Sequence, residues 1–242
     1  MAGPSGKKGA AAMRGGAVIE LENVSHAYGD REVFGEVSLS LEPGSFHFVT
    51  GPSGAGKTTL LELCHGALVP SEGRVRLFGQ DRREMTRDDI ARVRRRVGVV
   101  HQDCRFLDHL DITDNIALPL EVSGRDLLAE EANLRDLMGW VGLRDRARAY
   151  TPELSGGERQ RAALARAVIL SPDLVLADEP TGNVDSQISE RLMRLLIDLN
   201  RMGMAVCVAT HDLPLIRAVR LHVQCRILRI ADRRLQAAGA DL

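Results

Sequence analysis

The feature that most constrains the fold of this chain is the glycine-rich stretch GPSGAGKTT at residues 51–59. An apolar run at 46–50 precedes it, and apolar residues at helical spacing follow it. The stretch matches G-x-x-x-x-G-K-[ST] in the strand, loop and helix setting that a phosphate-binding loop requires. Glycines let backbone N–H groups curl around a phosphate chain, and the N-terminus of the following helix faces the same anion. The sequence therefore predicts a nucleotide-binding α/β protein.

The residues of this stretch have separate predicted roles. Lys57 supplies a positive charge for the β- and γ-phosphates, and the Thr58 hydroxyl is placed to ligate Mg²⁺. The alternative is an accidental glycine-rich turn, which is rare in one chain because average proteins contain only about 7% glycine. The predicted phosphate-binding residues are Gly51, Pro52, Ser53, Gly54, Ala55, Gly56, Lys57, Thr58 and Thr59.

Composition is typical of a protein with a sizeable core and no bias toward nucleic acid. Hydrophobic residues make up 44% and charged residues 27% of the 242 residues, and the formal net charge is −1. The 4 cysteines form no C-x-x-C pair, so we expect reduced thiols that bind no metal. No apolar run approaches the roughly 18–20 residues of a membrane span. If the protein works at a membrane, we expect another polypeptide to supply the span.

The chain divides into a tail and one domain. Residues 1–16 are rich in Gly, Ala and Ser and are predicted to be disordered, with the true start at Met1 or Met13. Residues 17–236 are predicted to form the domain. Its core strands are expected at 18–24, 32–41, 46–50, 75–78, 97–100, 173–177, 204–209 and 223–230.

A helical subdomain is predicted within that domain. Residues 103–154 carry apolar residues at helical spacing without a strand pattern. We interpret them as an insertion into an α/β core formed by 17–102 and 155–236.

The segment LSGGERQ at 154–160 predicts a second anion-binding helix terminus. Ser155 and Glu158 have the spacing of a capping box. An ordinary capped helix would explain these two residues. It would not explain Gly156 and Gly157, which weaken a first turn and are expected where backbone approaches a ligand.

Polar residues follow two of the predicted strands. Asp178 and Glu179 come directly after the apolar strand at 173–177, and His211 follows the strand at 204–209. Ligands of open α/β sheets bind at the carboxyl ends of the strands. Asp178 is therefore a candidate Mg²⁺ ligand, and Glu179 can aim at the water that attacks a γ-phosphate.

Two further residues depend on their surroundings for an interpretation. Tyr28, expected in a turn at 26–30, is either a half-buried turn aromatic or a surface on which adenine stacks. Asp185 or Ser186 is expected to cap an amphipathic helix that ends near Gly203.

Together, GPSGAGKTT, Gln102, LSGGERQ, LVLADEP, Asp185 and His211 resemble the motif set of the ABC-type ATPases, over roughly 18–229. This resemblance implies a P-loop NTPase core with a mostly parallel sheet, N-terminal antiparallel strands and an inserted helical subdomain. It implies ATP and Mg²⁺ as cofactors, with Thr58, Gln102 and Asp178 near the metal. The roles it implies are catalysis for Glu179, γ-phosphate contact for His211, adenine stacking for Tyr28, and a place at a dimer interface for Asp185.

The resemblance also implies partners. Members of the family work as head-to-tail dimers, in which Ser155, Gly156 and Gly157 of one subunit close on the nucleotide of the other. Within the family, the chain most resembles the cell-division branch. That branch acts on the cytoplasmic face of the inner membrane with a membrane protein of the FtsX type, and signals indirectly to cell-wall hydrolases. The lipoprotein-release and export branches, of the LolD and MacB types, are the alternative.

Function classes outside a membrane complex fit the sequence less well. A soluble ABC protein that acts on DNA or ribosomes usually carries tandem cassettes, coiled coils or zinc motifs, and these are absent from the sequence. A P-loop kinase has no use for LSGGERQ. A scaffold that binds ATP without turnover would differ only in an ATPase assay.

Two surface segments have open interpretations. Residues 103–110 carry Phe106, Leu107 and Leu110, which either pack inside the subdomain or line a groove for a helix of a membrane partner. The basic helix expected at 86–96 presents either a solvated face or a face for anionic lipid headgroups.

Overall fold

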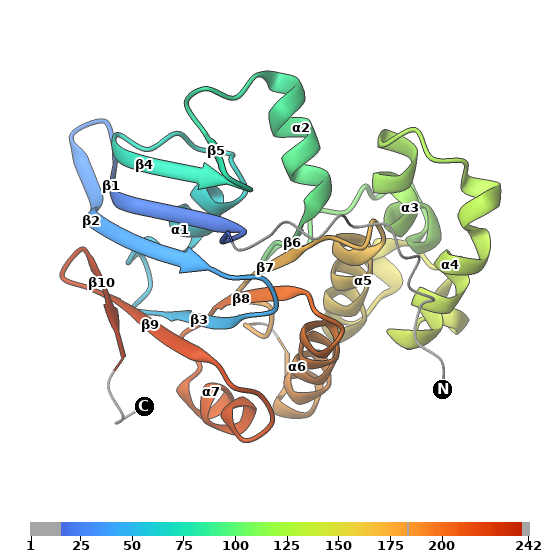
Figure 1. The fold of residues 1–242 in the computed structure, drawn as a ribbon. Helices are drawn as coiled ribbons and strands as arrows, with labels where there is room; N and C mark the ends of the chain where they lie inside the picture. The colour runs from blue at the N-terminus through green and yellow to red at the C-terminus, as the bar shows by residue number, and fades with distance from the viewer. Residues whose placement is uncertain (1–15, 183, 239–242) are drawn as a thin grey trace.

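The computed structural model describes residues 16–182 and 184–238, which form two sheets with helices between and beside them (Figure 1). The predicted tail lies outside these residues except for Gly16. A 4-stranded antiparallel sheet has the order β2-β1-β4-β5. Its strands are β1 (Ile19–Tyr28), β2 (Arg31–Leu41), β4 (Glu72–Leu77) and β5 (Gln80–Asp81).

The second sheet carries the phosphate-binding loop. It is 6-stranded, has the order β10-β9-β3-β8-β7-β6, and is parallel apart from β10, which pairs antiparallel with β9. Its strands are β3 (Phe46–Thr50), β6 (Val97–Val100), β7 (Leu174–Asp178), β8 (Ala205–Ala209), β9 (Arg226–Ala231) and β10 (Arg234–Ala237).

Helices cover both faces of the second sheet. Helix α1 (Lys57–Cys64) contacts strands of both sheets, while α5 (Gly156–Val168), α6 (Ser186–Arg201) and α7 (Leu213–Arg220) belong to the opposite face. Helix α2 (Arg87–Arg96) leads into β6, and α3 (Ile112–Val122) and α4 (Leu127–Trp140) pack beside α5. Every residue of β3, β7 and β8 is buried, as covered parallel strands require.

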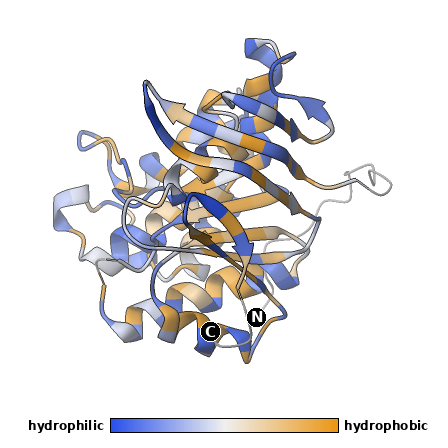
Figure 2. Ribbon diagram, turned by 90° about the vertical axis from the view of Figure 1, so that its left-hand side faces the viewer, coloured by the Kyte–Doolittle hydropathy of each residue, from blue (hydrophilic) through white to orange (hydrophobic). Residues whose placement is uncertain are grey.

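The apolar core consists of two clusters, and the parallel sheet lies between them. One cluster joins the antiparallel sheet, α1 and one face of the parallel strands. The other joins the opposite face to α3, α5, α6 and α7. Figure 2 shows that the strands in the middle of the molecule are largely apolar (orange), whereas the outer helices and loops alternate between orange and blue. Ile116 and Leu120 of α3 belong to the same cluster as Leu164 of α5. The division into core and helical subdomain remains a prediction.

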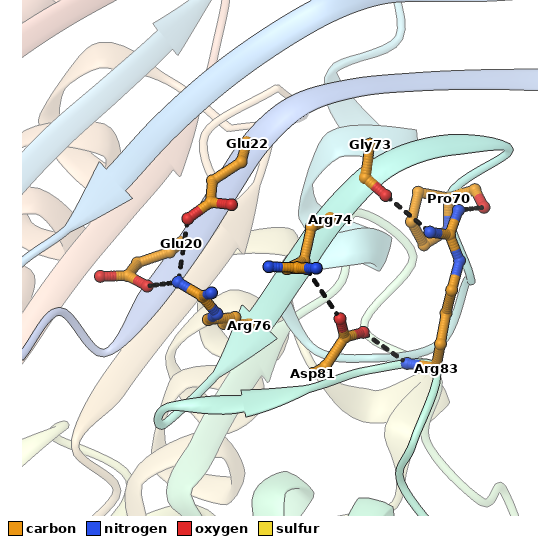
Figure 3. Close-up of polar contacts among 8 residues, drawn as sticks. All are labelled: Glu20, Glu22, Pro70, Gly73, Arg74, Arg76, Asp81 and Arg83. Carbon is orange, nitrogen blue, oxygen red and sulfur yellow. Dashed lines mark hydrogen bonds and ion pairs between the residues drawn. The ribbon is translucent and has the colours of Figure 1, made fainter.

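Charged residues cross-link the outer face of the antiparallel sheet (Figure 3). Arg76 on β4 lies 3.5 Å from Glu20 and 2.9 Å from Glu22, both on β1. Arg74 on β4 lies 3.1 Å from Asp81 on β5. Exposed pairs of this kind contribute roughly 0–1 kcal/mol each. They link β4 to β1 and β5 on the exposed face of the sheet, while the other face packs on α1.

Several predicted boundaries were wrong. Strand β1 continues past Val24 to Tyr28, because register shifts along the strand interrupt the alternation of apolar residues. Tyr28 therefore ends a strand and does not lie in a turn at 26–30. Strand β9 begins at Arg226, three residues after the predicted start at Val223. The short elements β5, α7 and β10 were not predicted.

The helix caps agree with the sequence patterns. Ser155 and Glu158 form the predicted capping box of α5, with the Ser155 amide donating to Glu158 at 2.8 Å. Asp185 caps α6, since its Oδ1 accepts from the Ile188 amide at 2.9 Å. This resolves the choice between Asp185 and Ser186.

Candidate nucleotide site

The loop between β3 and α1 has the backbone geometry of an anion cradle. Gly56 at the N-cap of α1 has φ 102° and offers no side-chain cap, so α1 opens on backbone N–H groups. A Cβ on Gly56 would lie 2.5 Å from Cγ1 of Val33. Only glycine fits this position, both for its φ and for its contact with β2.

The loop borders a cleft of about 860 Å³, within the range of small-molecule sites. The cleft is lined by segments from both sheets and from the loop after β6. Predicted site residues on its wall are Tyr28, Pro52, Ser53, Gly54, Ala55, Gly56, Lys57, Thr58, Thr59, Gln102, Asp178, Glu179 and His211. Gly51 lies at the buried start of the loop, where its carbonyl accepts from Lys57 Nζ at 3.0 Å.

Thr58 and Asp178 form an oxygen pair at the carboxyl edge of the sheet. The Thr58 hydroxyl donates to Oδ2 of Asp178 at 2.6 Å. Oδ1 of Asp178 is buried and has no hydrogen-bond partner among the described residues. Burial and the neighbouring Glu179 charge raise the pKa of Asp178, and the Thr58 hydrogen bond opposes them. These hard oxygen donors fit Mg²⁺, which takes one or two protein ligands and completes its shell with phosphate and water.

Lys57, Glu179 and His211 form a charged cluster beside that pair. Lys57 Nζ lies 3.2 Å from Oε1 of Glu179, and His211 Nδ1 lies 2.9 Å from the same oxygen. Burial would raise the pKa of Glu179, but the hydrogen bonds from His211 and Lys57 outweigh burial and lower the pKa. Glu179 is therefore ionised at neutral pH.

The second oxygen of Glu179 is chemically distinct from the first. Oε2 is buried and makes no hydrogen bond within the described part of the chain. Glu179 also has φ 43°, a left-handed backbone that is uncommon outside glycine. A carboxylate with one anchored oxygen and one unpaired oxygen has an acceptor left for a proton.

The loop that carries Gln102 is held by helix α5. The Gln160 side chain donates to the Gln102 carbonyl at 3.4 Å. Arg166 donates to the carbonyls of Cys104 and Arg105, and its guanidinium lies over the Phe106 ring. Any movement of α5 therefore acts on the loop beside the cleft.

Four predicted site residues lie elsewhere. Ser155, Gly156, Gly157 and Asp185 are outside the lining of the cleft among the residues that the structure describes. The structure also gives Gly157 a packing role, since a Cβ there would lie 2.6 Å from Cγ2 of Ile188 on α6. Packing on α6 is therefore a further reason for glycine at position 157, and the predicted approach to a ligand stays a prediction.

One wall of the cleft was not predicted from the sequence. Arg31, Glu32 and Val33 of β2 line it, together with residues 230–233 around the β9–β10 turn. Tyr28 lies on the same side and is half exposed, with its hydroxyl 3.5 Å from Oγ1 of Thr59. The sequence carries little signal for this turn, because Asp232–Arg233 lacks the glycine that usually marks a two-residue hairpin.

Two features are absent from the described residues. No group of three or more His, Cys, Asp or Glu side chains is placed to hold a metal. No described helix combines the length and the apolar character that crossing a membrane requires.

A strand, a glycine-rich loop and a helix that gather a lysine, a threonine and two carboxylates at one sheet edge define a P-loop nucleotide-binding protein. Residues 34–182 match the family model described as ABC transporter. The cell division ATP-binding protein FtsE of Escherichia coli K12 is 40% identical over 200 residues, 82% of this chain and 90% of that protein. FtsE of Bacillus subtilis is 35% identical over 207 residues, covering 85% and 91%.

A solved dimeric ATP-binding cassette, in a post-hydrolysis state with ADP and Pi, superposes with a TM-score of 0.81 at 30% identity. That match covers 91% of this chain and 99% of the cassette. The chain therefore belongs to the ABC transporter family and is an ATPase of that family. Both the fold and the activity implied by the motif set are confirmed.

Proposed function

We propose that this chain is the Mg-ATP-hydrolysing subunit of an FtsEX-type complex in cell division. It would act as a peripheral homodimer on the cytoplasmic face of the inner membrane, with an integral partner of the FtsX type. Its output would be a conformational signal to cell-wall hydrolases. The similarity to FtsE proteins over most of the chain supports this assignment.

The observation that supports the dimer is the separation of the N-terminus of α1 from that of α5, the predicted second anion-binding terminus. Helix α1 begins in the cleft, whereas α5 begins at Ser155, which is exposed and lies outside the cleft. In a head-to-tail dimer, Ser155, Gly156 and Gly157 of one subunit would cover the nucleotide on Lys57 of the other. Asp185 would lie at the same interface. Both solved structures that support this proposal are of one cassette, and both are dimeric.

Within one site, the residues have distinct proposed roles. Tyr28 stacks on adenine, the loop at 51–59 holds the phosphates, and Thr58 and Asp178 hold Mg²⁺ with help from Gln102. Glu179 accepts the proton of the attacking water on Oε2. His211 keeps Oε1 in place and contacts the γ-phosphate, while Mg²⁺ supplies charge neutralisation on the phosphates.

The membrane partner needs a docking surface. A groove of about 560 Å³ between α2 and α3 has apolar walls and three arginines, Arg87, Arg94 and Arg95. Such a groove fits an amphipathic helix with acidic residues. Anionic lipid remains the alternative for this basic face.

The Glu179→Gln variant tests the enzymatic part. Hydrolysis should fall by roughly 10²–10⁴ while ATP binding persists, because a general base is lost and no phosphate contact is removed. The variant should then accumulate as an ATP-bound dimer in light scattering, and adding Ser155→Arg should prevent that dimer.

A matched control is Asp173→Asn, just before the same strand, where the carboxylate pairs with Arg96 at 2.7 Å. It should hydrolyse ATP normally. Normal turnover by Glu179→Gln would remove Glu179 from its proposed role.

A transporter ATPase of the LolD or MacB type is the second candidate, favoured by a solved neighbour described as a bacterial ABC transporter cassette, with a TM-score of 0.80. Co-purification of the tagged chain from its own host separates the two. Recovery of an FtsX-type protein with division proteins supports the first, and recovery of an export permease supports the second.

A further inference from the structure

The wall of the cleft formed by β2 and the β9–β10 turn contains an arginine in an unfavourable backbone conformation. Strands β9 and β10 pair Ala231 with Arg234, so Asp232 and Arg233 alone form the turn between them. Both have left-handed backbones, with φ 49° and 60°. Two-residue hairpin turns of this kind strongly prefer Asn-Gly or Asp-Gly. Arg233 thus occupies a position where glycine would be free of strain.

The side chain of Arg233 is anchored toward the cleft. Its Nη1 lies 3.2 Å from Oε2 of Glu32 on β2, and its carbonyl accepts from the Gly35 amide at 2.9 Å. The other Glu32 oxygen, Oε1, lies over Gly35, where a Cβ would come within 2.8 Å of it. The ion pair therefore joins the hairpin turn to the strand that follows Tyr28.

The position and the charge of Arg233 suit it to contact a ligand in the cleft. Arg233, Glu32 and Tyr28 all line the cleft that contains the phosphate-binding loop. The Arg233 side chain is 67% exposed, so it keeps donors free of the core for a ligand. A residue that violates local backbone preference at a cleft is expected to serve binding.

We propose that Arg233 is a nucleotide-binding residue, which Glu32 holds in position to contact the ribose and α-phosphate of the nucleotide that stacks on Tyr28. This inference rests on the proposed ATP site and adds a contact that the phosphate-binding loop does not provide. A contact at this end of the nucleotide is present in both ATP and ADP, and it does not touch the reacting γ-phosphate. It therefore predicts an effect on affinity and none on the chemical step.

The test is the Arg233→Gly variant. Glycine removes the side chain and suits the left-handed backbone, so the melting temperature should not fall. The Kd values for ATP and ADP, measured by calorimetry, should both rise about three- to tenfold, between the effects of an exposed ion pair and a charged hydrogen bond. The KM for ATP should rise with them, and kcat should stay unchanged. Arg233→Lys should recover part of the affinity.

Arg234→Ala is the matched control. Arg234 is the next residue of the hairpin and pairs with Glu36 at 3.5 Å, outside the lining of the cleft among the described residues. It should bind both nucleotides as the wild type does. Glu32→Gln, which releases Arg233, should weaken both nucleotides in the direction of Arg233→Gly.

The results that would overturn the Arg233 proposal differ from those that would overturn the ATP site. Wild-type affinity in a folded Arg233→Gly variant would overturn the proposal, and so would an equal loss in Arg234→Ala. A loss for ATP but not ADP would place the contact at the γ-phosphate and overturn it as well. If the wild type hydrolyses ATP and the Lys57→Ala variant does not, the ATP site itself is upheld, whichever way the Arg233 variants behave.

Discussion

At the scale of single residues, the site is organised by one shared carboxylate oxygen. Oε1 of Glu179 receives both Lys57 and His211, and Lys57 also donates to the carbonyls of Gly51 and Pro52. Lys57 is 8% exposed, so these acceptors replace the water that the ammonium lost on burial. Arrival of the phosphates would move Lys57 from protein acceptors to nucleotide and leave Glu179 with His211.

Lys57→Ala should therefore weaken ATP binding at least about tenfold, because a charge-assisted contact contributes roughly 1.5–3 kcal/mol. Calorimetry with Mg-ATP checks this. Arg135→Ala is a suitable control, since Arg135 lies on α4 and pairs with Glu131 at 2.6 Å. Unchanged affinity in a folded Lys57→Ala variant would mean that the loop is not the nucleotide site.

At the scale of elements, α5 connects the predicted dimer contact at Ser155 with the loop of Gln102 beside the cleft. Its N-terminus holds the capping box, Gly157 packs on α6, and Gln160 and Arg166 hold the loop of Gln102. Ser155, Gly157 and Gln160 lie in the N-terminal half of the helix, and Arg166 lies near its C-terminal end. Closure of a partner subunit on Ser155 would thus be felt at Gln102 through one rigid element.

Gly157→Ala separates packing from ligand approach. The added Cβ would meet Ile188, and overpacking of this kind costs about 1–3 kcal/mol in the free energy of unfolding. The double variant Gly157→Ala with Ile188→Ala should regain much of that stability in urea denaturation. If Gly157→Ala lowers ATP hydrolysis and the double variant regains hydrolysis together with stability, packing is the reason for glycine at position 157. If stability returns without activity, the backbone at Gly157 also approaches the ligand.

The capping box of α5 predicts a dependence of stability on pH. Hydrogen bonds from the amide and hydroxyl of Ser155, with a smaller contribution from Arg146, lower the pKa of Glu158 from 4.5 to about 2. A pKa that is lower in the folded state stabilises the fold above the unfolded pKa, and this contribution is lost as pH falls toward the folded pKa.

The stability difference between wild type and Glu158→Gln should therefore be largest near neutral pH and shrink below about pH 4.5. Urea unfolding midpoints across that range measure it. Arg146→Ala should flatten the dependence less than Ser155→Ala does. A difference that stays constant with pH would contradict the assigned cause.

At the scale of the whole molecule, the segment 103–110 is the predicted docking surface for a membrane partner, and the groove between α2 and α3 is the alternative. The predicted Phe106 anchor is half-buried, packed against the core with the Arg166 guanidinium 4.7 Å from its ring centroid. Leu107 is 42% exposed, although Asn115 holds its backbone with hydrogen bonds of 2.8 and 3.0 Å. Leu107 is thus an outward apolar side chain on a fixed backbone.

Leu107→Glu should keep ATP binding and dimer formation but lose the membrane partner on co-purification. Burial of one large apolar anchor contributes roughly 1.5–3 kcal/mol, enough to weaken docking tenfold or more. Phe106→Glu should instead lower the melting temperature, because it places a charge against the core. Full recovery of the partner with Leu107→Glu would move the docking surface elsewhere, with the groove at Arg94 as the next candidate.

Local patterns in the sequence were sufficient for the phosphate-binding loop, the capped start of α5 and the buried strands β3, β7 and β8. Each depends on a few consecutive residues whose spacing has one physical reading: glycines before a lysine, a serine three residues before a glutamate, an unbroken apolar run. The same patterns named Asp178, Glu179 and His211, because parallel strands end at one edge of the sheet.

Only the tertiary structure decided which of these residues meet. Antiparallel pairing of β1 with β2 and the β9–β10 hairpin bring Glu32 and Arg233 together across 201 positions of sequence. Packing of α5 on α6 gave Gly157 a second reason to be glycine. Such contacts join segments that are distant in the chain. They depend on how whole elements pack, and no spacing of neighbouring residues encodes them.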